Sequence, residues 1–255
     1  RDYLRSRPVV SELEAIQRAI LFAGETGCAL HIAHVSTGRA VAMVAEAKVR
    51  GVDVTCETCP HYLVFTEEDL ERLGAVLKCA PPLRSPADRE ALWNEVAAGR
   101  VDFIASDHSP SPPETKAGTS FFQAWGGISG CQSTLAAMLT AGCAAGRLSP
   151  AQVAFLVSEG PARRLGLFPR KGTIAVGADA DLALVDLGAS EELSPADLRY
   201  RHRQSPYAGM RFACRIVRTL VRGITVVRDG RAVSPPVGRM VSPGTALPPR
   251  RGRAA

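Results

Sequence analysis

The sequence predicts an α/β fold, in which helices cover a parallel sheet and part of a small β domain follows. Three short, mostly apolar segments, at 28–36, 52–59 and 101–106, alternate with stretches of helical periodicity. This alternation is typical of parallel sheets, and nearly continuous apolar strands are expected where helices cover both faces. From about residue 172 the chain changes to short β-rich runs between glycines, which predicts an antiparallel unit.

The expected helices begin near capping side chains or end at glycines. They are expected at 11–24, 38–51, 67–73, 86–98, about 131–145 and 150–158. Ser11 and Glu14 have the spacing of a capping box. Ser85 precedes Pro86, a favoured pair for an N-cap and a first helical position. In the later β-rich part, Gly223 lies between two strand-like halves of 215–233 and predicts a turn there.

Two parallel architectures compete for the first part of the chain. A doubly wound nucleotide-binding fold has a glycine-rich phosphate loop after its first strand, and this sequence has none. A (β/α) barrel carries its chemistry at the C-terminal ends of its strands, which fits the positions of His34, His61, Asp107 and His108. Since a closed barrel needs eight strands, we expect either the C-terminal part of a longer protein or a half completed by strands from elsewhere.

We expect a partial barrel over 1–171, a small β domain segment over 172–235 and a disordered basic tail over 236–255. The formal net charge of +6 comes largely from arginines spread along the chain. No aromatic stacking surface or recognition motif accompanies them, so nucleic acid is not an expected partner. No apolar run approaches the roughly 20 residues that cross a bilayer, so a membrane is not an expected partner either.

The seven cysteines include one closely spaced pair, Cys56 and Cys59, in CETC. A zinc ribbon needs a second such pair, and haem attachment needs a histidine where Pro60 stands. We therefore expect these cysteines to be reduced thiols of a cytoplasmic protein, in or beside a strand, because cysteine is often simply buried.

The segment VDFIASDHSPSPPE ends a buried strand on Asp107 and His108. Burying such groups costs several kcal/mol unless they are paired or bind a metal. Imidazole and carboxylate are natural zinc ligands, and a carboxylate can accept a proton from metal-bound water. The alternatives are a helix cap or salt bridge for Asp107 and a purely structural role for a strand histidine. Because side chains alternate along a strand, we expect only one of His31 and His34 to face the barrel axis.

Several motifs in one order resemble the cyclic amidohydrolase family, which includes allantoinases, dihydroorotases and hydantoinases. They are HIAHVST, VTCETCPHYL, KCAPPLR, IASDHSPSPPETKAG, AWGGISGCQS, GTIAVGADADLALVD and YRHRQSPYAGM. The resemblance reaches to about residue 230. It implies the C-terminal part of a (β/α)8 TIM-type barrel, about strands 6–8, and a centre of two metal ions, usually zinc.

The resemblance also implies roles for individual residues. His34 on the sixth strand and Asp107 on the eighth would bind metal. In this family a water held by the metals attacks the ring amide, and Asp107 would take its proton and pass it to the leaving nitrogen. His61 and His108 would support the site by hydrogen bonds rather than bind metal.

For the substrate, the resemblance is closest to the allantoinases and implies the hydrolysis of allantoin to allantoate. Dihydroorotases carry Asn where this chain has Ala80, whereas in hydantoinases that residue contacts the ring through its backbone. We expect Ala80, Gly126, Gly127 and Ile128 to contact the substrate, with a plain loop turn as the alternative for the glycines. Dihydroorotase and hydantoinase activities are the alternative functions.

The chain departs from the family pattern in its metal ligands. The family has an H-x-H pair, a carboxylated lysine and a further histidine on earlier strands, and none of these is present here. The lysines match no ligand position: Lys48, Lys78, Lys116 and Lys171. We therefore expect the chain alone to be inactive. The complete protein is expected to be a homo-oligomer, a tetramer. A non-catalytic half-barrel, either a truncated product or a subunit completing another chain, is the alternative of a different class.

Overall fold

A parallel sheet forms the centre of the first part of the molecule. The structure, a computed structural model, describes residues 1–118 and 120–244. The strands β1 (Leu30–Ile32), β2 (Val54–Thr58) and β3 (Phe103–Ile104) lie in the order β1-β2-β3. Both pairings are parallel, with Leu30 opposite Val54 and Glu57 opposite Phe103. The expectation of a parallel sheet is confirmed.

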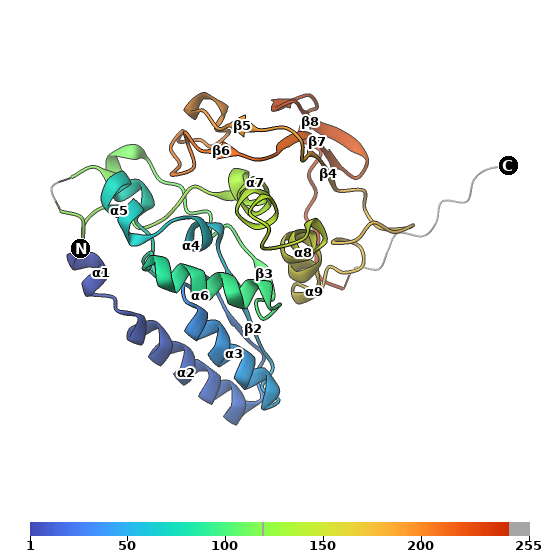
Figure 1. The fold of residues 1–255 in the computed structure, drawn as a ribbon. Helices are drawn as coiled ribbons and strands as arrows, with labels where there is room; N and C mark the ends of the chain where they lie inside the picture. Colours follow the sequence, from blue (N-terminus) through green and yellow to red (C-terminus); the bar gives the residue numbers. More distant parts are fainter. Residues whose placement is uncertain (119, 245–255) are drawn as a thin grey trace.

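Three helices pack on this sheet, as Figure 1 shows. They are α2 (Val9–Thr26), α3 (Gly38–Val49) and α6 (Pro86–Ala97). Val54 and Cys56 on β2 join Val41 and Val44 on α3 in the buried apolar core. The opposite face of the sheet carries His31, which is only partly buried.

Local capping signals correctly located several helix ends. Ser85 caps α6, since its Oγ accepts a hydrogen bond from Asp88 N at 3.1 Å. The capping box expected at Ser11 is wrong, because α2 begins earlier, after Pro8, and the Ser11 hydroxyl donates to the Pro8 carbonyl at 2.7 Å. Gly27 ends α2 in the left-handed conformation, with φ of 69°, which glycine adopts without a steric penalty.

The remaining helices are short. They are α1 (Asp2–Arg5), α4 (Pro60–Val64), α5 (Glu67–Leu73), α7 (Thr134–Met138), α8 (Pro150–Ala154) and α9 (Gly160–Arg164). The helix expected near 131–145 is a 3-10 turn, then α7, then a π-helix over Leu139–Ala144. The one expected at 150–158 is α8, followed by a π-helix over Phe155–Glu159 and then α9. No helix of the part described here is long and apolar enough to cross a membrane.

The strands are shorter than the apolar runs that predicted them. The run 28–36 forms a strand only at β1, because His34 has a φ of 42° and turns the backbone out of the extended conformation. The alternation argument that placed His31 and His34 on opposite faces therefore does not extend to His34.

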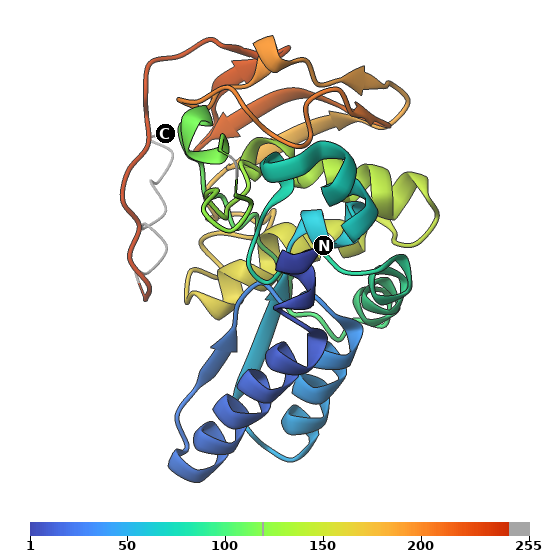
Figure 2. The same cartoon turned by 90° about the vertical axis from the view of Figure 1, so that its left-hand side faces the viewer.

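An antiparallel β unit follows, drawn in orange to red at the top of Figure 2. The strands β4 (Leu182–Asp186), β7 (Arg215–Val221), β8 (Ile224–Arg228) and β9 (Arg231–Ala232) form one sheet in that order. A second, smaller sheet pairs β5 (Glu191–Glu192) with β6 (Arg211–Phe212). The turn expected at Gly223 is present between β7 and β8. Most of the tail expected to be disordered, from residue 245 on, lies outside the described residues.

Candidate active site

The expected site residues lie just after the C-terminal ends of the three parallel strands. His34 follows β1, His61 lies on α4 directly after β2, and Asp107 and His108 follow β3. Because the strands are parallel, these ends meet at one edge of the sheet. His34 and Asp107 have φ of 42° and 43°, a left-handed conformation that is uncommon outside glycine and that clusters at functional sites.

The strained backbone of His34 is held by the residues that follow it. Val35 N donates to Glu57 O at 2.8 Å, and the Thr58 hydroxyl donates to Val35 O at 2.6 Å. Thr37 then caps α3 through Ala40 N. The Nδ1 atom of His34 is buried and has no hydrogen-bond partner among the described residues. A buried ring nitrogen without a protein partner has the chemistry of a metal ligand.

His61 is a buried, neutral imidazole near His34. It is 1% exposed, and neither ring nitrogen has a hydrogen-bond partner in the described part of the chain. Burial, and then the proximity of His34, lowers the pKa of His61 to about 3. Its ring packs on that of Tyr62, with centroids 4.2 Å apart. His61 therefore carries no charge near neutral pH.

His108 is oriented by contacts on two sides. Its Nδ1 accepts a hydrogen bond from Gly130 N at 3.2 Å, and its ring lies against Tyr200, with centroids 4.8 Å apart. An accepting Nδ1 leaves the proton of the neutral ring on Nε2. Burial lowers the pKa of His108, which favours this neutral form.

Asp107 is close to the segment that follows β2. Burial, and then the charge of Asp107, raises the pKa of the Cys59 thiol well above its usual value. All seven cysteines are free, and the buried Cys56 and Cys59 lie in and directly after β2, as expected for reduced thiols.

The two segments expected to contact substrate lie side by side. Gly127 N donates to Lys78 O at 2.8 Å, two residues before Ala80, and Ser109 N donates to Ile128 O at 2.9 Å. Ala80 and Gly126 are exposed, whereas Gly127 and Ile128 are buried. A Cβ on Gly127 would lie 2.5 Å from Ser109 Oγ, so only glycine fits there.

Two lysines that the sequence left without a role hold this loop. Lys116 Nζ donates to the carbonyls of Ala75 at 2.8 Å, Gly127 at 2.7 Å and Trp125 at 3.3 Å. Lys78 Nζ donates to three further loop carbonyls, those of Phe121, Phe122 and Ala124. Burial lowers the pKa of Lys116 to about 8. The only sequence signal was that both lysines stand beside proline- or glycine-containing segments.

The residues of this chain fit part of a metal site. The described residues contain no group of three or more His, Cys, Asp or Glu side chains that could hold a metal ion. A catalytic zinc takes three protein ligands. The two residues expected to bind metal, His34 and Asp107, do not by themselves complete such a centre.

The chain is similar to known proteins over most of its length. Residues 10–226 match the amidohydrolase family. The chain is 60% identical over 243 residues to the allantoinase of Rubrobacter xylanophilus and 55% identical to that of Deinococcus radiodurans. These alignments cover 95% of this chain but 53% and 54% of the relatives, so the chain spans about half the length of the curated relatives it matches.

Solved structures show the same relation. The L-hydantoinase of Arthrobacter aurescens superposes with a TM-score of 0.86 at 39% identity, over 89% of this chain and 51% of that one. A dihydropyrimidinase of Brevibacillus agri superposes with a TM-score of 0.86 at 31% identity, over 91% of this chain and 51% of that one. Proteins of this kind are generally metal-dependent hydrolases. The chain belongs to the amidohydrolase family.

Proposed function

We propose that this chain carries part of the active site of a metal-dependent allantoinase, which opens the hydantoin ring of allantoin to give allantoate. The observation that supports this most is the gathering of His34, Asp107 and the loops of Ala80 and Gly126 at one edge of the parallel sheet. The two allantoinases, 60% and 55% identical to this chain, support the choice of substrate. In this proposal β1, β2 and β3 are strands six to eight of a (β/α)8 barrel, and the small β domain begins near residue 172.

Two zinc ions are the proposed cofactor, with His34 and Asp107 among their ligands and the others supplied by residues outside this sequence. When bound, zinc lowers the pKa of water toward neutrality and polarises a carbonyl oxygen. The buried, unpartnered Nδ1 of His34 supports this assignment. His61 keeps the surroundings of His34 uncharged, because its pKa of about 3 leaves it neutral near pH 7.

Asp107 is the proposed proton carrier. As the oxygen of water bonds to the ring carbonyl carbon, the Asp107 carboxylate accepts its proton. The same proton then passes to the ring nitrogen as the carbon–nitrogen bond breaks. His108, held by Gly130 and Tyr200, supports this end of the site.

Gly126 is the loop residue best placed to bind the substrate ring. It is exposed, and among the described residues neither its N–H nor its carbonyl forms a hydrogen bond. Both backbone groups of Gly127 are already engaged, with Lys78 O and Lys116 Nζ. Gly127 and Ile128 thus shape the loop, and Ala80 borders it.

The experiment uses the full natural protein that carries this sequence. Allantoin, dihydroorotate and hydantoin are compared as substrates, before and after chelation and after zinc is restored. We expect the highest kcat/KM with allantoin, loss of activity on chelation and recovery with zinc. A preference for dihydroorotate or hydantoin would instead support those alternative activities. The L-hydantoinase of Arthrobacter aurescens, 39% identical to this chain, is the reason to include hydantoin. A zinc-loaded protein that opens none of these rings would support a non-catalytic half-barrel.

The assembly is proposed to be a homotetramer in the cytoplasm, without nucleic acid or membrane partners. The seven free cysteines agree with a reducing compartment. Light scattering of the full natural protein measures its mass, and a monomer would contradict the proposed assembly.

A further inference from the structure

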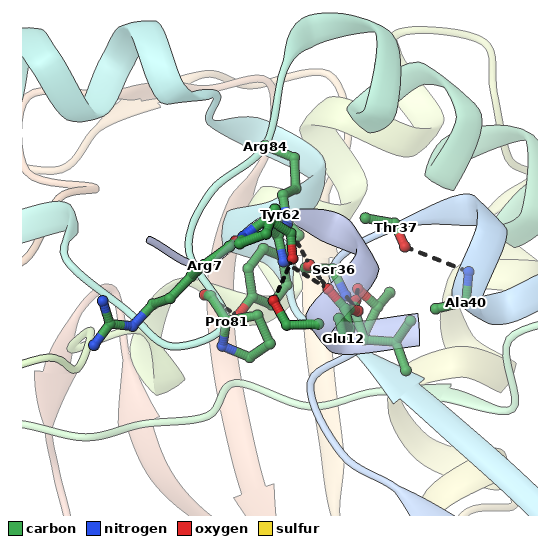
Figure 3. A network of polar contacts seen from close by, with 12 residues as sticks. Arg7, Glu12, Ser36, Thr37, Ala40, Tyr62, Pro81 and Arg84 are labelled. Atoms are coloured by element: carbon green, nitrogen blue, oxygen red, sulfur yellow. Dashed lines mark hydrogen bonds and ion pairs between the residues drawn. The ribbon is translucent and has the colours of Figure 1, made fainter. Parts of the chain in front are cut away.

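We infer that Arg84 is a positioning residue for the proposed active site: its guanidinium sets the relative position of the loop carrying His34 and the loop carrying Ala80. The inference rests on the function proposed above. Figure 3 shows the polar network that Arg84 forms with Glu12 and Ser36.

Each nitrogen of the Arg84 guanidinium has a partner in a different part of the chain. Nε donates to Ser36 Oγ at 2.9 Å, in the loop after β1. Nη1 donates to Arg7 O at 2.7 Å, before α2. Nη2 donates to the Glu12 carboxylate at 2.9 Å, in the first turn of α2. One planar group therefore joins three segments at the edge of the sheet where the proposed site lies.

Glu12 and Ser36 close the network into a ring. Glu12 Oε1 accepts from Ser36 N at 2.8 Å, and Oε2 accepts from the Ser36 hydroxyl as well as from Arg84. The Arg84 and Glu12 side chains are 8% and 6% exposed. Buried charges require such complete pairing, because water cannot replace a lost partner. The ring thus favours one arrangement of its three segments.

The first consequence concerns His34. Ser36 lies two residues further along the chain. Both backbone groups of the intervening Val35, its N–H and its carbonyl, are hydrogen-bonded to β2. A left-handed histidine persists only where its surroundings determine its conformation. The hydrogen-bonded ring of Arg84, Glu12 and Ser36 constrains the backbone that follows Val35. His34 and Arg84 also line one cavity, of about 280 Å³, together with Pro81.

The second consequence concerns Ala80. Its neighbours are held by two tyrosines: Tyr3 OH donates to Cys79 O at 2.8 Å, and Tyr62 OH donates to Pro81 O at 2.7 Å. Arg84 ends this loop and ties it to Ser36. The distance between the Ala80 loop and the His34 loop is therefore determined through Arg84, and no backbone hydrogen bond between those two loops is present in the described chain.

A partly buried ion pair at the other end of the sheet provides a control. Lys48 Nζ donates to both carboxylate oxygens of Asp102 at 2.7 Å, and Asp102 accepts from Cys56 N. Asp102 directly precedes β3 and thus lies at the N-terminal end of the sheet, opposite the proposed site. In barrel enzymes this end contributes stability rather than catalysis. Loss of the pair should lower stability and leave the site unchanged.

The test compares Arg84→Lys, Ser36→Ala and Lys48→Met in the full natural protein. Arg84→Lys keeps a positive charge opposite Glu12 but loses the forked geometry. Ser36→Ala removes one hydroxyl and leaves Arg84 and Glu12 paired. It therefore tests the inference even if the arginine variant folds poorly. Each variant is measured for Tm, for kcat and KM with allantoin, and for zinc retained after dialysis.

We expect Arg84→Lys to fold, to lose about 100-fold in kcat/KM, with both a lower kcat and a higher KM, and to release zinc faster, because displacements near 1 Å have effects of this size. Ser36→Ala should change the same quantities less. Lys48→Met should lower Tm alone. Wild-type kcat/KM and zinc retention in folded Arg84→Lys and Ser36→Ala would overturn the inference, as would an equal loss in Lys48→Met. If the wild type opens no ring, the proposed function fails, and zinc retention still decides the role of Arg84.

Discussion

His31 and His34 lie three residues apart and differ in their hydrogen bonds. His31 shares hydrogen bonds with Thr55 Oγ1 at 2.8 Å and Glu57 Oε2 at 3.3 Å, and its ring stacks on Phe103. The buried Nδ1 of His34 has no partner among the described residues. His31 is thus satisfied within the protein, whereas His34 is available to a ligand.

We therefore predict that His34→Ala lowers the zinc content of the full natural protein and that His31→Ala does not. Loss of the His34 imidazole removes a metal ligand, whereas loss of His31 removes only contacts within the sheet. Metal analysis of the two purified variants provides the measurement. If only His31→Ala lost zinc, His31 rather than His34 would be the ligand.

Asp107→Asn should abolish turnover while leaving the fold intact. An amide can still form hydrogen bonds but cannot accept the proton of the attacking water. General-base catalysis typically contributes 100-fold or more, so kcat should fall by at least about that factor. Far-ultraviolet circular dichroism provides the control for folding. A variant that keeps more than about a tenth of the wild-type kcat would exclude Asp107 as the proton carrier.

Lys116 predicts a pH dependence of stability. Burial lowers its pKa to about 8 in the folded protein, from an ordinary value of 10.5. Between these two values the unfolded chain binds more protons than the folded one, so this group's contribution to the free energy of unfolding rises with pH. The cost of the buried ammonium is present in full below about pH 8 and is lost towards pH 10.5.

The measurement compares the wild type with Lys116→Met from pH 7 to 10.5. The difference between them cancels the titration of the other groups, including the buried thiols and tyrosines. We expect the wild type to gain stability relative to the variant across this range. A constant difference would mean that the ammonium is not buried as described.

At the scale of elements, the close contact of α3 with α6 depends on one glycine. A Cβ on Gly38, the first residue of α3, would lie 2.6 Å from the carbonyl oxygen of Ala91 on α6. Gly38→Ala should therefore lower the free energy of unfolding by about 1–3 kcal/mol, as overpacking usually does. Gly24→Ala in α2 is the control, since its Cβ would make only an ordinary contact at 3.6 Å with Val52.

The control should raise stability by up to about 1 kcal/mol, because alanine favours a helix over glycine. Both values come from urea unfolding of the full natural protein. If Gly38→Ala proved as stable as Gly24→Ala, the two helices would not be packed as closely as the structure shows.

At the scale of the whole molecule, the parallel sheet has an open edge. The outer side of β1 has no strand partner among the described residues, and the same residues hold no complete set of metal ligands. We predict that residues 1–255 expressed alone neither hydrolyse allantoin nor bind two zinc ions tightly, and that they associate through this edge. Zinc analysis, an allantoin assay and light scattering test the prediction. An active monomer with two zinc ions would contradict it.

Much of the fold could be predicted from local sequence, because helix ends depend on neighbours in the chain. Ser85 and Pro86 correctly located the start of α6, and the turn expected at Gly223 is present between β7 and β8. Strand lengths were overestimated, since an apolar run continues after the backbone has left the sheet, as it does at His34. The capping box at Ser11 failed because the helix begins one turn earlier.

The sequence alone determined the alternation of strands and helices, the position of the polar residues at the strand ends, and the family resemblance that the comparison confirmed. Only the tertiary structure decided how the site is held. Arg84 and Glu12 are 72 positions apart in the chain, and Lys78 contacts loop carbonyls 43 or more positions away. Such contacts leave no local pattern, because a buried charge is stabilised by whichever distant groups the fold brings within hydrogen-bonding distance.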